Sequence, residues 1–130
     1  KKGIAYDHHM EVGIMVETPA AALISDKLAK EVDFFSIGTN DLSQYTLVVD
    51  RTSRVLSDFF NPHHPAVLKL IQMTVENAHK EGIWVGMCGE LGSDLSITET
   101  FLRMGVDEFS VAPYSVLPLR KQIRSIDLSK

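Results

Sequence analysis

Residues 12–19 join an apolar run to a helix-start signal, in the order Val12-Gly13-Ile14-Met15-Val16-Glu17-Thr18-Pro19. The apolar run is continuous rather than alternating, which is typical of a strand buried on both faces. Threonine is a favoured N-cap and proline is favoured at the first helical position, so the sequence predicts a helix over residues 20–30. We expect this helix to face the core through Ala22, Leu23, Leu28 and Ala29.

The same strand–helix unit recurs three more times along the chain. Further apolar strands are predicted at residues 34–37, 83–87 and 109–111. Helices are predicted at residues 42–49 (short, or a turn), from Pro65 to a stop at Gly82, from a capping box at 96–99 to Gly105, and at 118–126. Successive strand–helix units predict an α/β fold with a parallel sheet covered by helices.

Composition narrows the class of protein. The chain has 130 residues, a formal net charge of −4 and one cysteine. The charge argues against a nucleic-acid footprint, and the sequence has no apolar run long enough to span a membrane. Its first residues do not form the apolar core of a signal peptide. We therefore expect a globular chain without a disulfide, in a reducing, cytoplasmic setting.

Polar or reactive side chains follow three of the predicted strands. Glu17 follows the first, Asn40 and Asp41 follow the second, and Cys88 and Glu90 follow the third. In parallel α/β folds, functional sites are built at the carboxyl ends of the strands. We expect these side chains to meet there.

Each of these residues has a functional and a structural interpretation. Glu17 and Asp41 could hold one Mg²⁺ ion, which takes one or two protein carboxylates, or they could cap helices. Arg51 could bind a phosphate through its guanidinium fork, or lie solvated in a loop. Cys88 could be a proton donor, a nucleophile or a buried apolar residue. The adjacent histidine pairs at 8–9 and 63–64 lack the spacing of metal ligands.

Three motifs carry a resemblance to a known family. They are Asp33-Phe34-Phe35-Ser36-Ile37-Gly38-Thr39-Asn40-Asp41-Leu42-Ser43-Gln44-Tyr45-Thr46-Leu47 followed by Asp50-Arg51, Gly13-Ile14-Met15-Val16-Glu17-Thr18-Pro19-Ala20, and Gly86-Met87-Cys88-Gly89-Glu90-Leu91. Together they resemble PEP-utilising enzymes over nearly the whole chain. Within that family the chain looks most like the PEP–protein phosphotransferases, enzyme I of the bacterial sugar phosphotransferase system. Val48, where the family more often has a small residue, leaves the spacing to Arg51 intact.

The resemblance implies a role for each matched residue. Glu17 and Asp41 would be the protein ligands of Mg²⁺. Asn40 and Asp41 would contact PEP around its phosphate, and Arg51 would bind that phosphate. Cys88 would donate a proton to C3 of the enolate and so complete pyruvate.

The resemblance also implies a partial fold. A complete (β/α)8 (TIM) barrel needs about 200–250 residues, so residues 1–130 would be a single partial domain, the C-terminal half of the PEP-binding barrel. In this family a histidine on a separate N-terminal domain accepts the phosphoryl group and passes it to HPr. We therefore expect the chain to be inactive alone.

Two alternatives remain open at this point. The first is a fragment of pyruvate phosphate dikinase or PEP synthase, which share the signature. The second is a non-catalytic self-association module, because a half barrel exposes two sheet edges that can pair. Both this second reading and the family lead us to expect a homo-oligomer.

Overall fold

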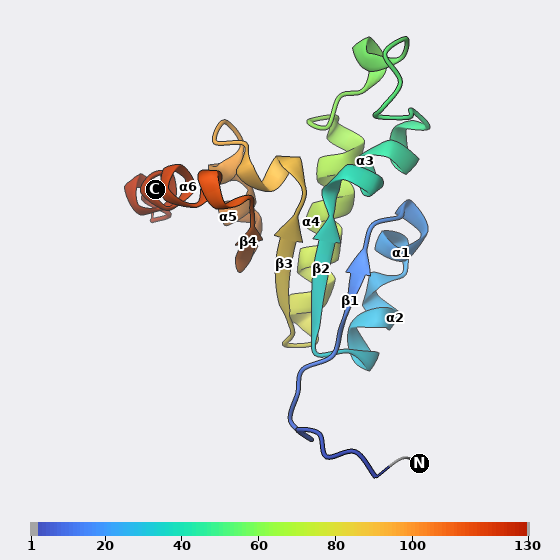
Figure 1. Cartoon of the computed structure of the whole chain (residues 1–130), viewed down its shortest axis with the longest axis vertical. Coiled ribbons are helices and arrows are strands. Elements are labelled where there is room, and N and C mark those ends of the chain that lie inside the picture. The colour runs from blue at the N-terminus through green and yellow to red at the C-terminus, as the bar shows by residue number, and fades with distance from the viewer. Residues whose placement is uncertain (1–2, 130) are drawn as a thin grey trace.

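The computed structural model describes residues 3–129 and contains one parallel sheet (Figure 1). Its strands follow chain order, β1-β2-β3-β4, and every neighbouring pair is parallel. They are β1 (Gly13–Val16), β2 (Phe34–Gly38), β3 (Trp84–Cys88) and β4 (Glu108–Ser110). Consecutive barrel strands have this order, whereas a doubly wound sheet reverses direction at a switch point. The α/β prediction is confirmed, and the order is that of a partial barrel.

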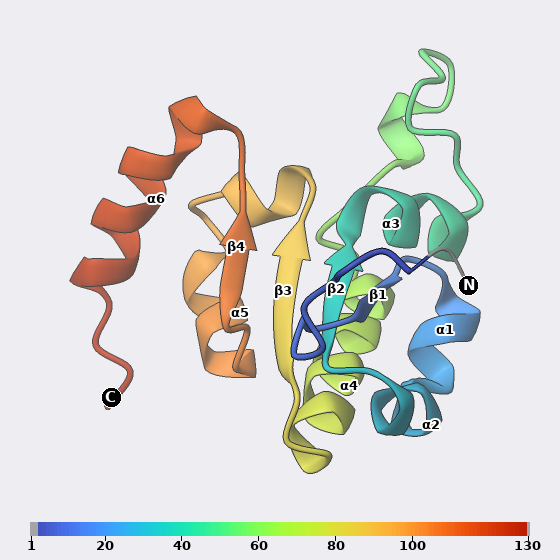
Figure 2. The ribbon, with the colours of Figure 1, turned by 60° about the horizontal axis from the view of Figure 1, so that its bottom comes forward.

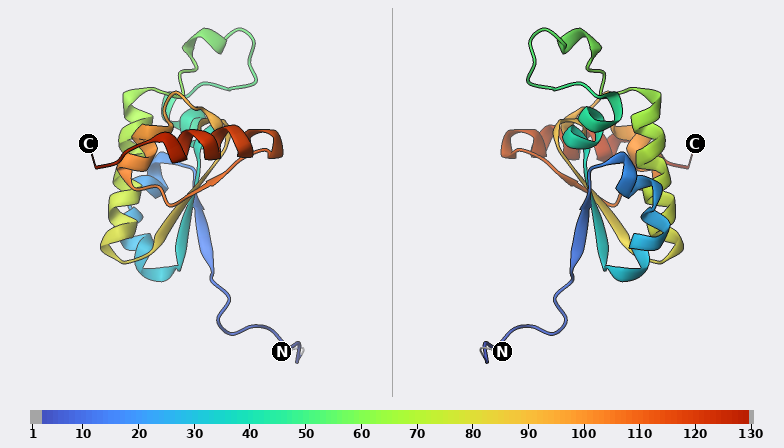
Figure 3. Two further views of the ribbon diagram at one scale, coloured as in Figure 1. Left: turned by 90° about the vertical axis from the view of Figure 1, so that its left-hand side faces the viewer. Right: turned by 90° about the vertical axis from the view of Figure 1, so that its right-hand side faces the viewer.

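Helices cover one face of the sheet, as both views in Figure 3 show. This layer holds α1 (Pro19–Leu23), α2 (Ser25–Leu28), α4 (Pro65–Lys80) and α5 (Thr98–Met104). The helix α3 (Thr39–Leu47) lies instead over the carboxyl ends of the strands (Figures 1 and 3). The last helix, α6 (Pro113–Ser125), lies beside the edge strand β4 (Figure 2). Short 3₁₀ turns are η1 (Ala29–Glu31), η2 (Ser57–Phe59) and η3 (Glu90–Ser93).

The core lies between the sheet and this helical layer. The side chains of Phe35, Ile37 and Val85 are fully buried there. From α4, the predicted inward residues Val67, Ile71, Val75 and Ala78 are also fully buried, and Leu68 packs against them. Burial of this apolar stripe is the main force that holds α4 on the sheet. In the part of the chain described, no helix is both long and apolar enough to cross a membrane.

The helix predicted over residues 20–30 is interrupted. Thr18 caps α1 as expected, since its hydroxyl oxygen accepts a 3.1 Å bond from the backbone N–H of Ala21. The hydroxyl of Ser25 then donates to the carbonyl of Ala22 at 2.8 Å, a local bond that competes with regular helix. Ala22 and Ala29 are buried as predicted, but Leu23 is 63% exposed, so its assignment to the core is wrong.

Two helices begin earlier than predicted. The helix α3 starts at Thr39 rather than at residue 42, so Asn40 and Asp41 lie in its first turn instead of in a loop. The helix α6 starts at Pro113 rather than at Pro118, so Pro113 takes the first helical position that proline suits and Pro118 lies inside the helix.

The capping box predicted at residues 96–99 is also wrong. Ile97 is the N-cap of α5 and makes no side-chain cap bond. The hydroxyl of Ser96 donates instead to the Asp94 carboxylate at 2.6 Å, and Glu99 accepts from Arg103 one turn along the helix. The polar side chains therefore bond within the preceding turn and along the helix surface.

The second face of the sheet carries a different set of residues. Phe34 and Trp84 stack there with ring centroids 4.4 Å apart, and Met15 is 48% exposed. Ser36 and Cys88 lie on this same face, because they alternate along their strands with the buried core residues. In a complete barrel this face would line the interior.

Candidate functional site

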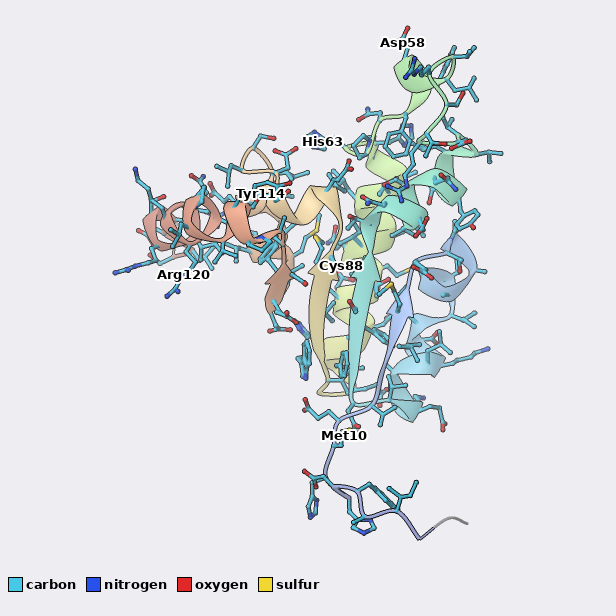
Figure 4. The ribbon with its side chains drawn as sticks, in the orientation of Figure 1. Met10, Asp58, His63, Cys88, Tyr114 and Arg120 are labelled. Atoms are coloured by element: carbon cyan, nitrogen blue, oxygen red, sulfur yellow. The ribbon has the colours of Figure 1, made fainter. Side chains whose placement is uncertain are left out.

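A hollow of about 230 Å³ lies at the carboxyl edge of the sheet. Five site residues named from the sequence line it: Glu17, Asn40, Asp41, Arg51 and Cys88. Glu90, which we also expected at this edge, is not among its lining residues. The other lining residues are Met15, Gly38, Thr39 and Gly89. Figure 4 shows Cys88 beside β2 on β3, with the loop that bears Asp58 above it. Three strand ends and one loop thus bring these side chains together.

The loop after β3 is held by the start of α3. The buried hydroxyl of Thr39 donates to the carbonyl of Cys88 at 2.9 Å. The side-chain oxygen of Asn40 accepts from the backbone N–H of Glu90 at 3.0 Å. This second bond identifies the oxygen of the Asn40 amide, so its NH₂ group remains available as a donor. Thr39 was not among the residues predicted for the site, because its place near Cys88 depends on the strand register.

Gly89 fits between these two bonds. Its φ is +102°, which L side chains rarely adopt, and a Cβ there would collide with the Thr39 hydroxyl. Gly38 meets a similar constraint, because a Cβ there would lie 2.9 Å from Oε2 of Glu17. The missing side chain at Gly38 lets the Glu17 carboxylate lean over the end of β2.

The N-terminus of α3 faces the same edge. Its N-cap is Gly38, and no side chain caps it. The first N–H groups of a helix have no partner within the helix and carry partial positive charge. A bare N-terminus of this kind favours anions such as phosphate.

Arg51 returns to the hollow through a tight turn after α3. Val48 ends that helix in the left-handed conformation, with φ of 55°. The backbone N–H of Arg51 donates to the side-chain oxygen of Gln44 at 3.2 Å. Asp50 accepts bonds from the hydroxyl and the backbone N–H of Thr52, and these bonds lower the pKa of the Asp50 carboxyl.

A two-carboxylate site suits Mg²⁺ better than it suits a transition metal. Within residues 3–129, no three His, Cys, Asp or Glu side chains are grouped to hold a metal ion. Glu17 and Asp41 nevertheless line one hollow, and oxygen ligands are those that Mg²⁺ prefers. The donor set therefore fits an ion that takes one or two carboxylates and fills its other positions with water or substrate oxygens.

Neither His63 nor His79 lines this hollow, and each lies close to a different carboxylate. His63 Nε2 is 2.7 Å from Asp94 Oδ2, and His79 Nε2 is 3.0 Å from Asp107 Oδ2. A larger hollow, of about 390 Å³, runs along α6 and is lined by Leu117, Arg120, Lys121, Arg124 and Ser125. It contains none of the residues named from the sequence, so we place the site at the carboxyl edge of the sheet.

Comparison with known proteins identifies the family to which the chain belongs. Residues 1–128 match the family described as PEP-utilising enzyme, PEP-binding domain. The chain is 52% identical over 127 residues to a phosphoenolpyruvate-protein phosphotransferase of Haemophilus influenzae, which covers 98% of this chain and 22% of that protein. It is 52% identical over 126 residues to the protein of that name from Bacillus subtilis, covering 97% of this chain and 22% of the relative. It is 48% identical over 130 residues to the protein of the same name from Buchnera aphidicola, and this match covers 100% of this chain and 23% of that relative. The chain thus spans less than a quarter of these relatives, and it belongs to the PEP-binding domain family of the PEP-utilising enzymes.

Proposed function

We propose that this chain is the part of a PEP–protein phosphotransferase that binds PEP with Mg²⁺ and protonates the enolate left after phosphoryl transfer. One observation carries the proposal. Glu17, Asn40, Asp41, Arg51 and Cys88 line a single hollow although they come from three strand ends and a loop. That set combines carboxylates for a hard cation, donors for a phosphate and a proton source.

The phosphate of PEP would lie between α3 and Arg51. The Arg51 guanidinium can bind two phosphate oxygens at once. The NH₂ group of Asn40 and the bare N-terminus of α3 supply further donors. These groups stabilise negative charge on the phosphoryl group as its bond to the enolate oxygen breaks.

Glu17 and Asp41 would hold the Mg²⁺ ion. When bound, the ion supplies positive charge beside the phosphoryl and enolate oxygens. Asp41 is in the first turn of α3, so the same helix start orients a metal ligand and Asn40. Both carboxylates are fixed on regular elements or directly after them, which reduces the cost of orienting them.

Cys88 would complete the product. Phosphoryl transfer leaves the enolate of pyruvate, whose electron pair at C3 takes the proton from the thiol. The S–H bond breaks, a C–H bond forms, and the sulfur keeps the electron pair as a thiolate. Water returns a proton to the sulfur. Cys88 is neither fully exposed nor fully buried, so its thiol can meet substrate and later solvent.

The remaining steps need other parts. A histidine on a separate N-terminal domain would accept the phosphoryl group and pass it to HPr, in the cytoplasm. Residues 1–130 would form a single partial domain, inactive alone, that self-associates as a homo-oligomer. Addition of PEP, Mg²⁺ and HPr to this chain should therefore give no turnover, and robust turnover would contradict this part of the proposal.

A chimera tests the chemistry directly. We would replace the matching 126 residues of the Bacillus subtilis protein with this chain, since the two are 52% identical there. We expect PEP- and Mg²⁺-dependent phosphorylation of HPr, with large losses in Glu17→Gln and Cys88→Ala. An active chimera that is unaffected by Cys88→Ala would refute the role of the thiol. An active chimera that requires ATP would favour a dikinase-like function instead.

A further inference from the structure

The thiol of Cys88 has a side-chain neighbour on the adjacent strand. The hydroxyl of Ser36 donates a hydrogen bond to Sγ of Cys88, with 3.9 Å between oxygen and sulfur. The register partner of Cys88 on β2 is Gly38, so Ser36 lies two residues earlier and the contact runs diagonally across the strand pair. Such diagonal neighbours share one face of a sheet.

Two glycines leave room for this contact. Gly86 is the register partner of Ser36, and Gly38 is the register partner of Cys88. Neither position places a side chain between the hydroxyl and the thiol. At Gly86 an added Cβ would lie only 2.9 Å from Oε2 of Glu108, so a larger residue there would crowd the same face. The space between the Ser36 hydroxyl and the Cys88 sulfur therefore depends on the two glycines, one on each strand.

We propose that Ser36 is a positioning residue for the Cys88 thiol, an inference that rests on the proposed role of Cys88 as proton donor. Because the Ser36 hydroxyl donates to a sulfur lone pair, the thiol hydrogen takes no part in that bond. It is free to point at the substrate in the hollow. Thr39 holds the backbone of the same residue through its 2.9 Å bond to the Cys88 carbonyl. Cys88 is thus fixed at both its backbone and its sulfur.

The same bond also follows the charge that develops during transfer. As the proton leaves sulfur for C3, the S–H electron pair stays on the sulfur and negative charge grows there. A hydrogen bond to a charged acceptor is stronger than one to a neutral acceptor. The Ser36 hydroxyl therefore stabilises the transition state more than the ground state, as catalysis requires.

The chain itself allows a direct test, because Cys88 is its only cysteine. The variants are Ser36→Ala, which removes the donor, and Ser36→Thr, which keeps a hydroxyl. The matched control is Ser110→Ala. Ser110 is the register partner of Cys88 on the other side, on β4, and within residues 3–129 it makes no bond to the sulfur. Circular dichroism and thermal melting would verify that each variant is folded.

Two readouts report on the sulfur and need no substrate. Three-bond NMR couplings should give one χ1 rotamer of Cys88 in the wild type, Ser36→Thr and Ser110→Ala, and an average of rotamers in Ser36→Ala. The rate of alkylation by iodoacetamide at one neutral pH should fall about threefold in Ser36→Ala alone. Without the Ser36 donor the sulfur loses both its fixed orientation and the neighbouring hydroxyl dipole, and the reactivity of a cysteine depends on these surroundings. Unchanged rotamer and rate in folded Ser36→Ala, or equal effects in Ser110→Ala, would overturn the proposal.

The active chimera separates this inference from the proposed function. Ser36→Ala should lower kcat about threefold or more with the KM for PEP unchanged, since the bond acts in the proton-transfer step. A solvent isotope effect on kcat would show that proton transfer limits the rate. If kcat then remained unchanged in Ser36→Ala, that result would contradict the positioning role. Full activity of Cys88→Ala would instead refute the proposed function and leave the Ser36–Cys88 contact intact in the two substrate-free readouts.

Discussion

Thr39 and Cys88 are joined across two strand–helix units, because the Thr39 hydroxyl donates to the Cys88 carbonyl at 2.9 Å although the residues are 49 apart in sequence. The Thr39 side chain is buried. We expect Thr39→Val, which keeps the shape and removes the donor, to lower the free energy of unfolding by about 1–3 kcal/mol, because the partly buried Cys88 carbonyl loses its partner. Urea unfolding followed by circular dichroism measures the change.

Thr46 offers a matched control on the same helix. Its hydroxyl oxygen is buried and has no hydrogen-bond partner in the described part of the chain. Thr46→Val removes a polar group that forms no bond, so we expect no loss of stability, or a gain of up to about 1 kcal/mol. If Thr46→Val destabilised the chain as much as Thr39→Val, the loss would reflect valine in α3 rather than the bond to Cys88.

Gly89 should tolerate no side chain. Its φ is +102°, and an added Cβ would collide with the Thr39 hydroxyl. We expect Gly89→Ala to cost about 2–4 kcal/mol in unfolding free energy, because backbone strain adds to the clash. Gly82→Ala is the control, since Gly82 has φ of +76° and an added Cβ would meet nothing within 4 Å. It should cost only about 1 kcal/mol. Equal losses in the two variants would show that strain alone decides the outcome at Gly89.

The alternation of strands and helices was predictable, but several boundaries were not. The strands were recognisable as continuous apolar runs at residues 13–16 and 34–38. The helix α4 was recognisable from the helical spacing of Val67, Ile71 and Val75. The break near Ser25 depends on one side-chain bond to Ala22. Such bonds are optional, so a residue type alone does not predict them.

The site residues could be named from their positions after strands, yet their supports could not. Glu17, Asp41 and Cys88 follow apolar runs, and strand ends are where parallel folds place sites. Ser36 lies inside an apolar run, and Thr39 is the first residue of a helix, where polar residues are common. Their partners are fixed by the pairing of Gly38 with Cys88, a register that single-chain patterns do not reveal.

Asp94 should make stability depend on pH. Its pKa is lowered, first by the hydrogen bond from the Ser96 hydroxyl, then by the Ser96 backbone N–H and by His63, against an opposing effect of burial. A carboxyl with a lowered folded-state pKa stabilises the fold above its unfolded pKa, and this contribution is lost as pH falls through the folded value. We expect Asp94→Asn to reduce the unfolding free energy at pH 7 by less than about 1 kcal/mol, because solvent screens the partly exposed carboxylate.

The effect of Asp94→Asn on stability should itself depend on pH, and this dependence shows whether the charge of Asp94 is responsible. The difference between wild type and Asp94→Asn should shrink below about pH 4, where Asp94 in the unfolded chain becomes protonated. Asp58→Asn, at the exposed turn η2 (Figure 4), removes a carboxylate that makes no hydrogen bond or ion pair within residues 3–129. Urea titrations at several pH values should show no comparable difference for that variant. A pH-independent loss in Asp94→Asn would mean that its hydrogen-bond geometry, rather than its charge, matters.

Arg51 provides the sharpest test of phosphate binding. Lysine keeps the positive charge but lacks the planar fork that binds two phosphate oxygens. In the chimera, Arg51→Lys should therefore raise the KM for PEP about tenfold, equivalent to about 1.4 kcal/mol. Arg120→Lys makes the same exchange on α6, in the hollow that contains none of the named site residues, and should leave KM unchanged. If Arg51→Lys lowered kcat with KM unchanged, the guanidinium would act on the transferring phosphoryl group rather than on bound PEP.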